Sequence, residues 1–224
     1  VGMGVRDERR VETTAAILDV ARAHVARDGA AALSLRAVAR DLDLAVSALY
    51  RYYRDRDALL TALITEAFHD VADHVGTAMG DPVRPTSRAR RRAWTAAAVA
   101  YRKWAQEHPS RFLLIFGTPV PGYEAPAEPT RPAGTRIPRM LADLLVGVEV
   151  PRQRMDRPTR AQLTSLAGLL GSDVSADALA VGIAAWDAVH GHVMLELSGQ
   201  FGPLTAADGL FSLVVKAQTE RLRL

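Results

Sequence analysis

The stretch "LSLRAVARDLDLAVSALYRYYRDRDALL", residues 33–60, decides the fold because it holds two short helical segments joined by a tight turn. Ser34 can cap the first segment and Asp55 the long helix that follows, since both side chains accept hydrogen bonds from free backbone N–H groups. A turn through Asp43 separates the two segments. This arrangement is typical of a helix-turn-helix, which the sequence predicts over about residues 34–53.

The segment after the turn places its polar groups on one side. At about 100° per residue, a wheel with Leu49 toward the core puts Tyr53 and Ala45 near Leu49 and puts Ser47 and Arg51 on the opposite side. Tyr50 lies on a flank. Hydroxyl, phenol and guanidinium groups on one face suit contact with a DNA groove. The alternative is a solvated helix whose tyrosines only cover apolar surface.

Helical periodicity also dominates the rest of the chain, and no sustained strand-like alternation is present. The proline-rich residues 117–138 read as a long loop. The sequence therefore predicts an all-α protein with an N-terminal helix-turn-helix domain at 1–56 and a helical-bundle domain for ligand binding and dimerisation at 57–224. Besides the helix-turn-helix, helices are expected near residues 7–27, 56–79, 87–108, 138–150, 159–170, 175–199 and 205–224.

The composition excludes several classes of site. The 224 residues include no cysteine, which excludes disulfides, thiolate metal ligands and a cysteine nucleophile. The net charge is only +3, but all basic residues except Lys103 and Lys216 are arginines, which suit phosphate recognition. A GC-rich genome would explain the arginines equally well. No apolar run approaches the roughly 20 residues of a membrane span, so the sequence predicts a soluble, cytoplasmic protein.

Residues 15–64, "AAILDVARAHVARDGAAALSLRAVARDLDLAVSALYRYYRDRDALLTALI", resemble the DNA-binding domain of the TetR family of bacterial transcriptional regulators. The matching features are the first helix ending in "DG", the "LSLRAVARDL" helix, and "LYRYYRDRDALL" leading into a long fourth helix. The resemblance implies a homodimer that binds a double-stranded DNA operator and responds to a small-molecule effector. It also implies base or phosphate contacts by Ser34, Arg36, Ala45, Val46, Ser47, Ala48, Tyr50, Arg51, Tyr52 and Arg56.

Two positions depart from the family pattern. Asp43 stands at the turn position that glycine usually holds, and aspartate tolerates a left-handed conformation better than most residues. Ala45 stands where a capping serine or threonine is frequent, so we expect Asp43 or Ser47 to compensate.

The segment 175–199 is apolar on nearly all sides and therefore needs neighbours on several sides. Together with the last helix it is expected to form a four-helix interface with its symmetry mate, as in TetR-like dimers. The motif "WDAVHGHVMLEL" is similar to that of the WHG-type TetR C-terminal domain, with Trp186, His190 and Gly191. The interface residues expected are Leu179, Val181, Ala185, Ala188, Leu195, Leu210, Phe211 and Val214.

Aromatic side chains gather in the predicted C-terminal domain, and a hollow between their helices is the expected effector site. His190 lies on an apolar face of the segment 175–199, and we interpret it as a hydrogen-bonded core residue or as a ligand contact. The expected ligand-binding residues are Trp94, Tyr101, Trp104, Phe112, Phe116, Trp186 and His190.

The competing functions are a helical metal-dependent enzyme and a small-molecule carrier without DNA function. Glu66 and His69 form an E-x-x-H pair, as in di-iron bundles, but such sites need four carboxylates and two histidines. No catalytic triad motif, phosphate loop or dinucleotide fingerprint is present. We therefore expect no catalytic residue, no metal and no cofactor.

Overall fold

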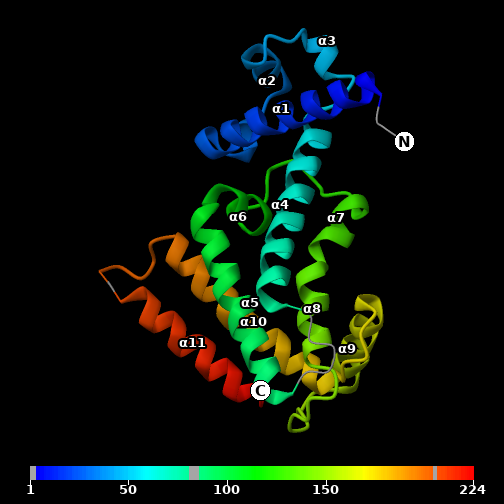
Figure 1. The fold of residues 1–224 in the computed structure, drawn as a ribbon. Coiled ribbons are helices and arrows are strands. Elements are labelled where there is room, and N and C mark those ends of the chain that lie inside the picture. Colours follow the sequence, from blue (N-terminus) through cyan, green and yellow to red (C-terminus); the bar gives the residue numbers. More distant parts are fainter. Residues whose placement is uncertain (1–3, 81–85, 204–205) are drawn as a thin grey trace. The chain divides into compact units, whose positions relative to one another are not determined.

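The computed structural model describes residues 4–80, 86–203 and 206–224, and the described ranges contain helices and no strand (Figure 1). The all-α expectation is confirmed. The helices are α1 (Val5–Asp28), the 3-10 turn η1 (Ala30–Ala32), α2 (Leu35–Asp41), α3 (Val46–Leu49), α4 (Arg56–Met79), α5 (Ser87–Glu107), α6 (Pro109–Phe116), α7 (Ala127–Gly134), α8 (Arg136–Leu144), α9 (Arg157–Leu170), α10 (Ala176–Leu197) and α11 (Ala207–Arg221).

The connection from α6 to α8 differs from the loop expected over residues 117–138. Helix α7 occupies part of it, and α8 begins at Arg136 and ends at Leu144 instead of reaching residue 150. Pro138 does not break α8, because it lies in the first turn, where backbone N–H groups have no partner within the helix. The expected start of the last helix, residue 205, lies outside the described residues.

The chain divides into two compact units. The first comprises residues 1–69 and 108–133, and the second comprises residues 70–107 and 134–224. The sequence places a domain boundary at residue 56, whereas the compact units divide within α4. The reason is that the first part of α4 supplies buried leucines to the core of the first unit.

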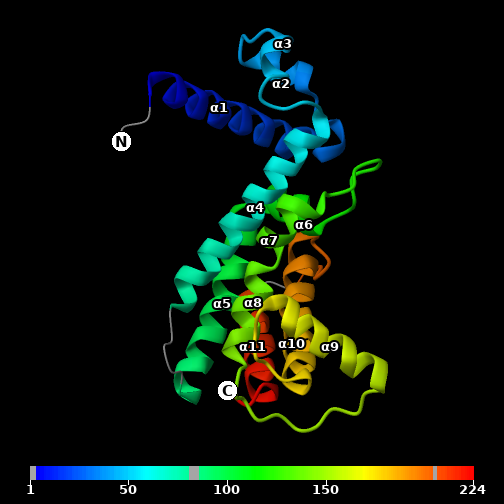
Figure 2. The ribbon, with the colours of Figure 1, turned by 90° about the vertical axis from the view of Figure 1, so that its right-hand side faces the viewer.

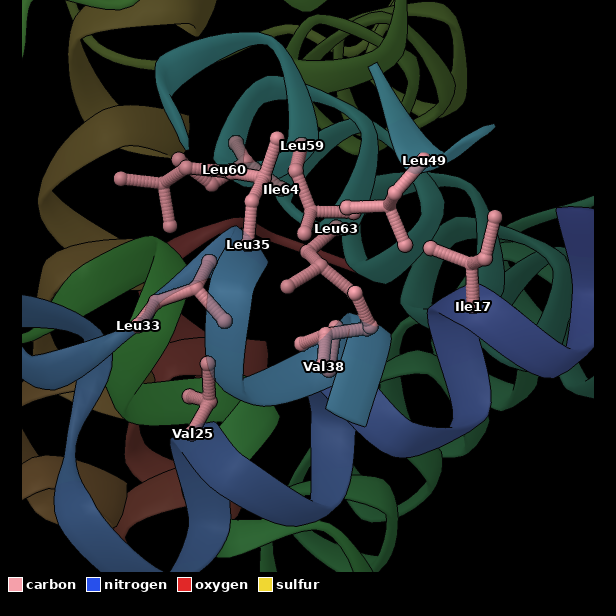
Figure 3. Packing of buried hydrophobic residues seen from close by; sticks show 12 residues of the cluster. Ile17, Val25, Leu33, Leu35, Val38, Leu49, Leu59, Leu60, Leu63 and Ile64 are labelled. Carbon is pink, nitrogen blue, oxygen red and sulfur yellow. The ribbon is translucent and has the colours of Figure 1, made fainter. Parts of the chain in front are cut away.

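Each helix that contributes to the core of the first unit buries one apolar face in it. Figure 3 shows Val38 of α2 and Leu49 of α3 in the same cluster as Leu63 of α4 and Ile17 of α1. All four side chains are buried. At about 25 cal/mol per Å² of apolar area, burial of such side chains stabilises a small unit far more than the propensity of its short helices does. Packing therefore fixes which side of α3 remains outside.

In the second unit, α10 is the central helix and packs against α5, α8, α9 and α11 (Figures 1 and 2). These neighbours explain why it is apolar on several sides. By length and composition it is also the one described helix that would suffice to cross a membrane. The expectation that no apolar run approaches that length was therefore wrong, and the packing of α10 accounts for its composition.

Candidate functional site

The turn between α2 and α3 is built around Asp43. Its φ of 52° lies in the left-handed region, as expected for the residue in the glycine position. The Leu44 N–H donates to the Ala39 carbonyl at 2.9 Å, and the Asp43 N–H donates to the Arg40 carbonyl at 3.2 Å. This pair of hydrogen bonds is the Schellman arrangement, which satisfies the carbonyls at the end of a helix.

Helix α3 is one regular turn, and helical hydrogen bonds continue from it to residue 53. The N–H of Tyr52 and the N–H of Tyr53 both donate to the Leu49 carbonyl, at 2.9 and 3.1 Å. Ala45 is the N-cap residue, and no side chain caps the helix. The expected compensation by Asp43 or Ser47 is therefore wrong, and the N–H groups at the start of α3 remain available to an external acceptor such as a phosphate.

The orientation predicted by the helical wheel is confirmed for Leu49, Ser47 and Arg51. It is wrong for Ala45, which the wheel places near Leu49 but which is exposed, because Ala45 precedes the first helical residue of α3. Leu49 is fully buried, and Tyr53 is half-buried against the core of the first unit. Ala48 is half-buried. The outer face of α3 and the residues after it are exposed, and they comprise Ala45, Val46, Ser47, Tyr50 and Arg51.

Two arginines on this surface are not engaged by the protein. Arg36, in the first turn of α2, and Arg51 are exposed, and within the described residues neither side chain forms an ion pair or hydrogen bond. In contrast, Arg40 pairs with Asp41 and Arg54 pairs with Asp55. An arginine without a partner in the protein can present its full set of donors to a base edge or a phosphate.

Three other residues that are expected to contact DNA are partly buried or already bonded within the protein. Ser34 is the half-buried N-cap residue of α2, but its side chain makes no capping hydrogen bond, so the expected cap by its hydroxyl is wrong. Tyr52 is partly buried against the core, and the Arg10 guanidinium carbon lies 5.7 Å from the centroid of its ring. Arg56 donates to the carbonyls of Ala30 and Ala31, both at 3.2 Å. The contacts of Tyr52 and Arg56 hold the region together whether or not DNA is bound.

Two polar contacts that brace this unit are not visible in the sequence pattern. Nε2 of His24, a buried residue of α1, lies 2.8 Å from Oδ2 of Asp41, and the hydrogen bond lowers the pKa of Asp41. Arg22 of α1 donates to both carboxylate oxygens of Glu66 in α4, at 2.6 and 2.7 Å. Glu66, half of the E-x-x-H pair, therefore serves an ion pair. Only the tertiary fold brings these partners together.

In the second unit, the expected aromatic site is filled by its own side chains. Trp94, Tyr101 and Trp104 are buried. The Tyr101 ring centroid lies 4.7 Å from that of Trp186, and its hydroxyl lies 2.7 Å from Nδ1 of His190. Burial lowers the pKa of His190. Phe112 and Phe116 lie instead in the first unit, where their ring centroids are 5.1 Å apart.

A cavity of about 280 Å³ lies among α8, α9 and α10. Trp186 lines it, whereas Trp94, Tyr101, Trp104 and His190 do not. Most of the wall is aliphatic, with Leu141, Leu170 and Ile183 among the lining residues. The volume is near the lower end of the roughly 300–1,000 Å³ typical of small-molecule sites.

Half of the expected dimer residues lie in the core of a single protomer. Leu179, Val181, Ala185 and Phe211 are 5% exposed or less. Ala188 and Val214 are half-buried, while Leu195 and Leu210 are exposed. Leu213, which the sequence pattern did not single out, is 64% exposed. The reason is that α10 and α11 pack against each other within the protomer.

Comparison with protein families matches both halves of the chain. Residues 17–63 match the family described as bacterial regulatory proteins, tetR family. Residues 94–218 match the tetracyclin repressor-like C-terminal domain.

Individual relatives cover nearly the whole chain. The HTH-type transcriptional regulators Rv1816 of Mycobacterium tuberculosis and Mb1846 of Mycobacterium bovis are each 33% identical to it, over 98% of this chain and 94% of the relative. The crystal structure of the regulatory protein SCO4313 aligns with a TM-score of 0.78 at 31% identity, over 96% of this chain and 98% of the other. The TetR family regulator PfmR of Thermus thermophilus shares the fold, with a TM-score of 0.53 at 16% identity, over 92% and 97% of the two chains.

Proposed function

Because the chain belongs to the TetR family and is therefore a DNA-binding transcriptional regulator rather than an enzyme, we propose that it is a cytoplasmic repressor whose homodimer binds a near-palindromic operator. In this proposal a small, largely apolar effector releases the repressor from DNA. The observation that carries the DNA part is the exposed surface of α3 and the residues after it, where Ser47, Tyr50 and Arg51 are exposed. Arg36 of α2 is also exposed, and within the described residues its side chain has no partner.

The chemistry of this surface suits both kinds of DNA contact. A guanidinium group can donate two hydrogen bonds to a guanine edge in the major groove, which specifies sequence. Hydroxyl groups and the uncapped N–H groups at the start of α3 suit phosphates, which fix position without reading sequence. In this proposal Arg51 reads bases, and Tyr50, Ser47 and Arg36 hold the backbone.

A single unit of this size offers little surface for specific binding, which supports a dimer. Two copies related by a two-fold axis would place their recognition helices about 34–36 Å apart, one turn of the duplex. Exposed leucines on α10 and α11 supply an apolar face for this association, namely Leu195, Leu210 and Leu213. A dimer seated on a promoter would block polymerase without a further partner.

An effector that binds in the second unit can change DNA affinity only if its binding is transmitted to the first unit. Helix α4 contributes residues 56–69 to the first unit and residues 70–79 to the second, so it is a continuous covalent connection. An effector acts only if it binds one conformation more tightly than the other, and a typical coupling of about 1–3 kcal/mol would weaken DNA binding 5- to 150-fold. The cavity among α8, α9 and α10 is the site we propose for it.

Selection of bound fragments from total genomic DNA, followed by sequencing, tests the function. We expect enrichment of one inverted repeat whose half-sites are centred about one helical turn apart. Expression of the neighbouring gene should rise when the regulator is deleted. Failure to enrich any sequence over non-specific DNA would instead favour a small-molecule carrier that has lost its DNA function.

A further inference from the structure

The mouth of the cavity carries one charged group. Asp187 of α10 follows Trp186 and lines the cavity together with aliphatic residues of α8 and α9. Thr135 is the other lining residue with a polar side chain among those described. A ligand that fills this cavity therefore meets an apolar wall and one carboxylate.

Within the described residues, the Asp187 carboxylate has no ion pair and no hydrogen bond. The arginines of α8 do not neutralise it, because Arg136 pairs with Asp73 and Arg139 pairs with Asp143. Asp177, near the start of α10, forms an ion pair with Arg160. Asp187 thus differs from these neighbouring carboxylates in having no cationic partner.

The helices that form the aliphatic wall approach each other closely at one point. At Gly182, a lining residue, an added Cβ would lie 2.6 Å from a methyl carbon of Leu145. Any larger residue there would require the Leu145 side chain to shift. Leu166 and Ile183, by contrast, are 37% and 38% exposed, so the cavity is reached from solvent past them.

We propose that the cavity binds a small apolar amine, with its hydrocarbon or aromatic body among α8, α9 and α10 and its ammonium group paired with Asp187 at the mouth. This inference rests on the proposed function, because it names the chemical class of the effector. An opposite charge is attracted to the carboxylate, and a carboxylate ligand of the same shape is repelled. The apolar wall offers no partner that would stabilise a second charge.

Trp186 provides a direct readout, because it is the one tryptophan that lines the cavity. The probes are 4-phenylbutylamine, 4-phenylbutanol and 4-phenylbutyrate, which share one body and differ in charge. Each is titrated against the full-length protein without DNA while tryptophan fluorescence is followed. The Trp186→Phe variant shows which part of the signal comes from the cavity.

We expect the amine to bind most tightly and the acid most weakly. Asp187→Asn should weaken amine binding roughly 1.5- to fivefold, as for an exposed ion pair, and should reduce the difference between the three probes. The matched control is Asp173→Asn, which removes an exposed carboxylate that does not line the cavity. It should leave all three affinities unchanged.

The inference is overturned if the acid binds as tightly as the amine, if Asp187→Asn leaves amine binding unchanged, or if none of the probes changes the Trp186 signal. A final titration measures release of operator DNA by the amine. Amine binding with the expected ranking but without DNA release would uphold the ligand class and contradict the effector role. Absence of a specific operator would contradict the proposed function independently of the cavity.

Discussion

The Tyr101 hydroxyl of α5 and Nδ1 of His190 in α10 lie 2.7 Å apart, and this hydrogen bond joins two helices of the second unit across a buried aromatic cluster. The histidine of the Trp-His-Gly motif therefore has a partner inside the protein. We interpret His190 as a structural residue, because the cavity is lined by other residues of α10.

Replacing Tyr101 by phenylalanine should lower the free energy of unfolding by about 0.5–1.5 kcal/mol, because one buried hydrogen bond is lost while the ring is kept. Urea unfolding followed by circular dichroism measures the change. Tyr50→Phe is the matched control, since Tyr50 is 47% exposed. Equal stability of the two variants would show that the Tyr101–His190 bond contributes nothing.

Replacing Arg51 by alanine should weaken operator binding by about 1–3 kcal/mol and relax specificity, if the guanidinium reads a base edge. Tyr50→Phe should weaken binding to all sequences alike, because a phosphate contact carries no sequence information. Fluorescence anisotropy with specific and scrambled duplexes measures both effects. Arg154→Ala, an exposed arginine of the second unit, is the control, and unchanged binding by both test variants would place the recognition face elsewhere.

Asp43→Gly should preserve or raise the stability of the first unit by a few tenths of a kcal/mol, because glycine adopts a positive φ without steric cost. Asp43→Val should lower it by about 1–2 kcal/mol, since a β-branched residue is strained in the left-handed region. Thermal unfolding of the two variants gives the comparison. If valine were tolerated as well as glycine, the turn would not depend on the left-handed conformation.

Glu196→Gln should lower the stability at neutral pH by about 1–3 kcal/mol. Arg102 donates to both oxygens of Glu196, at 2.6 and 2.7 Å, and this hydrogen bonding lowers the pKa of Glu196 below its ordinary 4.5. A lowered pKa means that the stabilisation is fully present above the unfolded-state pKa and is lost as the pH falls through the folded-state value. The difference between wild type and variant should therefore shrink below about pH 4.5.

Denaturant unfolding at a series of pH values tests the behaviour of Glu196. Asp208→Asn is the control, because Asp208 accepts from the same arginine at 2.8 Å but its side chain is 94% exposed. Solvent screens such a pair, so its loss should be nearly neutral. A difference between wild type and Glu196→Gln that stays constant with pH would rule out the ion pair as its source.

Leu213→Glu should raise the dissociation constant of the dimer by at least tenfold, because a charge would have to be buried in an apolar interface. Leu169→Glu, a leucine of α9 that is 82% exposed, should leave the dimer intact. Light scattering over a dilution series measures both. A wild-type protein that stays monomeric at micromolar concentration would contradict the dimer itself.

The sequence alone determined the elements whose signals are local. Asp55 accepts from the N–H of Ala58 at 2.7 Å and thereby caps the start of α4 as expected. The left-handed turn at Asp43 and the buried side of α3 also follow from residue type and helical period. Each of these depends on residues within one or two turns of chain, where backbone geometry limits the possibilities.

The tertiary structure decided which apolar and aromatic side chains became core and which surrounded a space. The wheel of α10 cannot tell that Trp186 would both contact Tyr101 and line a cavity. Nor can the wheel of α11 tell that Phe211 would be buried within one protomer while Leu213 stayed exposed. Burial of this kind depends on contacts between helices that are far apart in sequence. The hydrophobic effect is non-directional, so hydrophobicity alone does not specify which helices make contact.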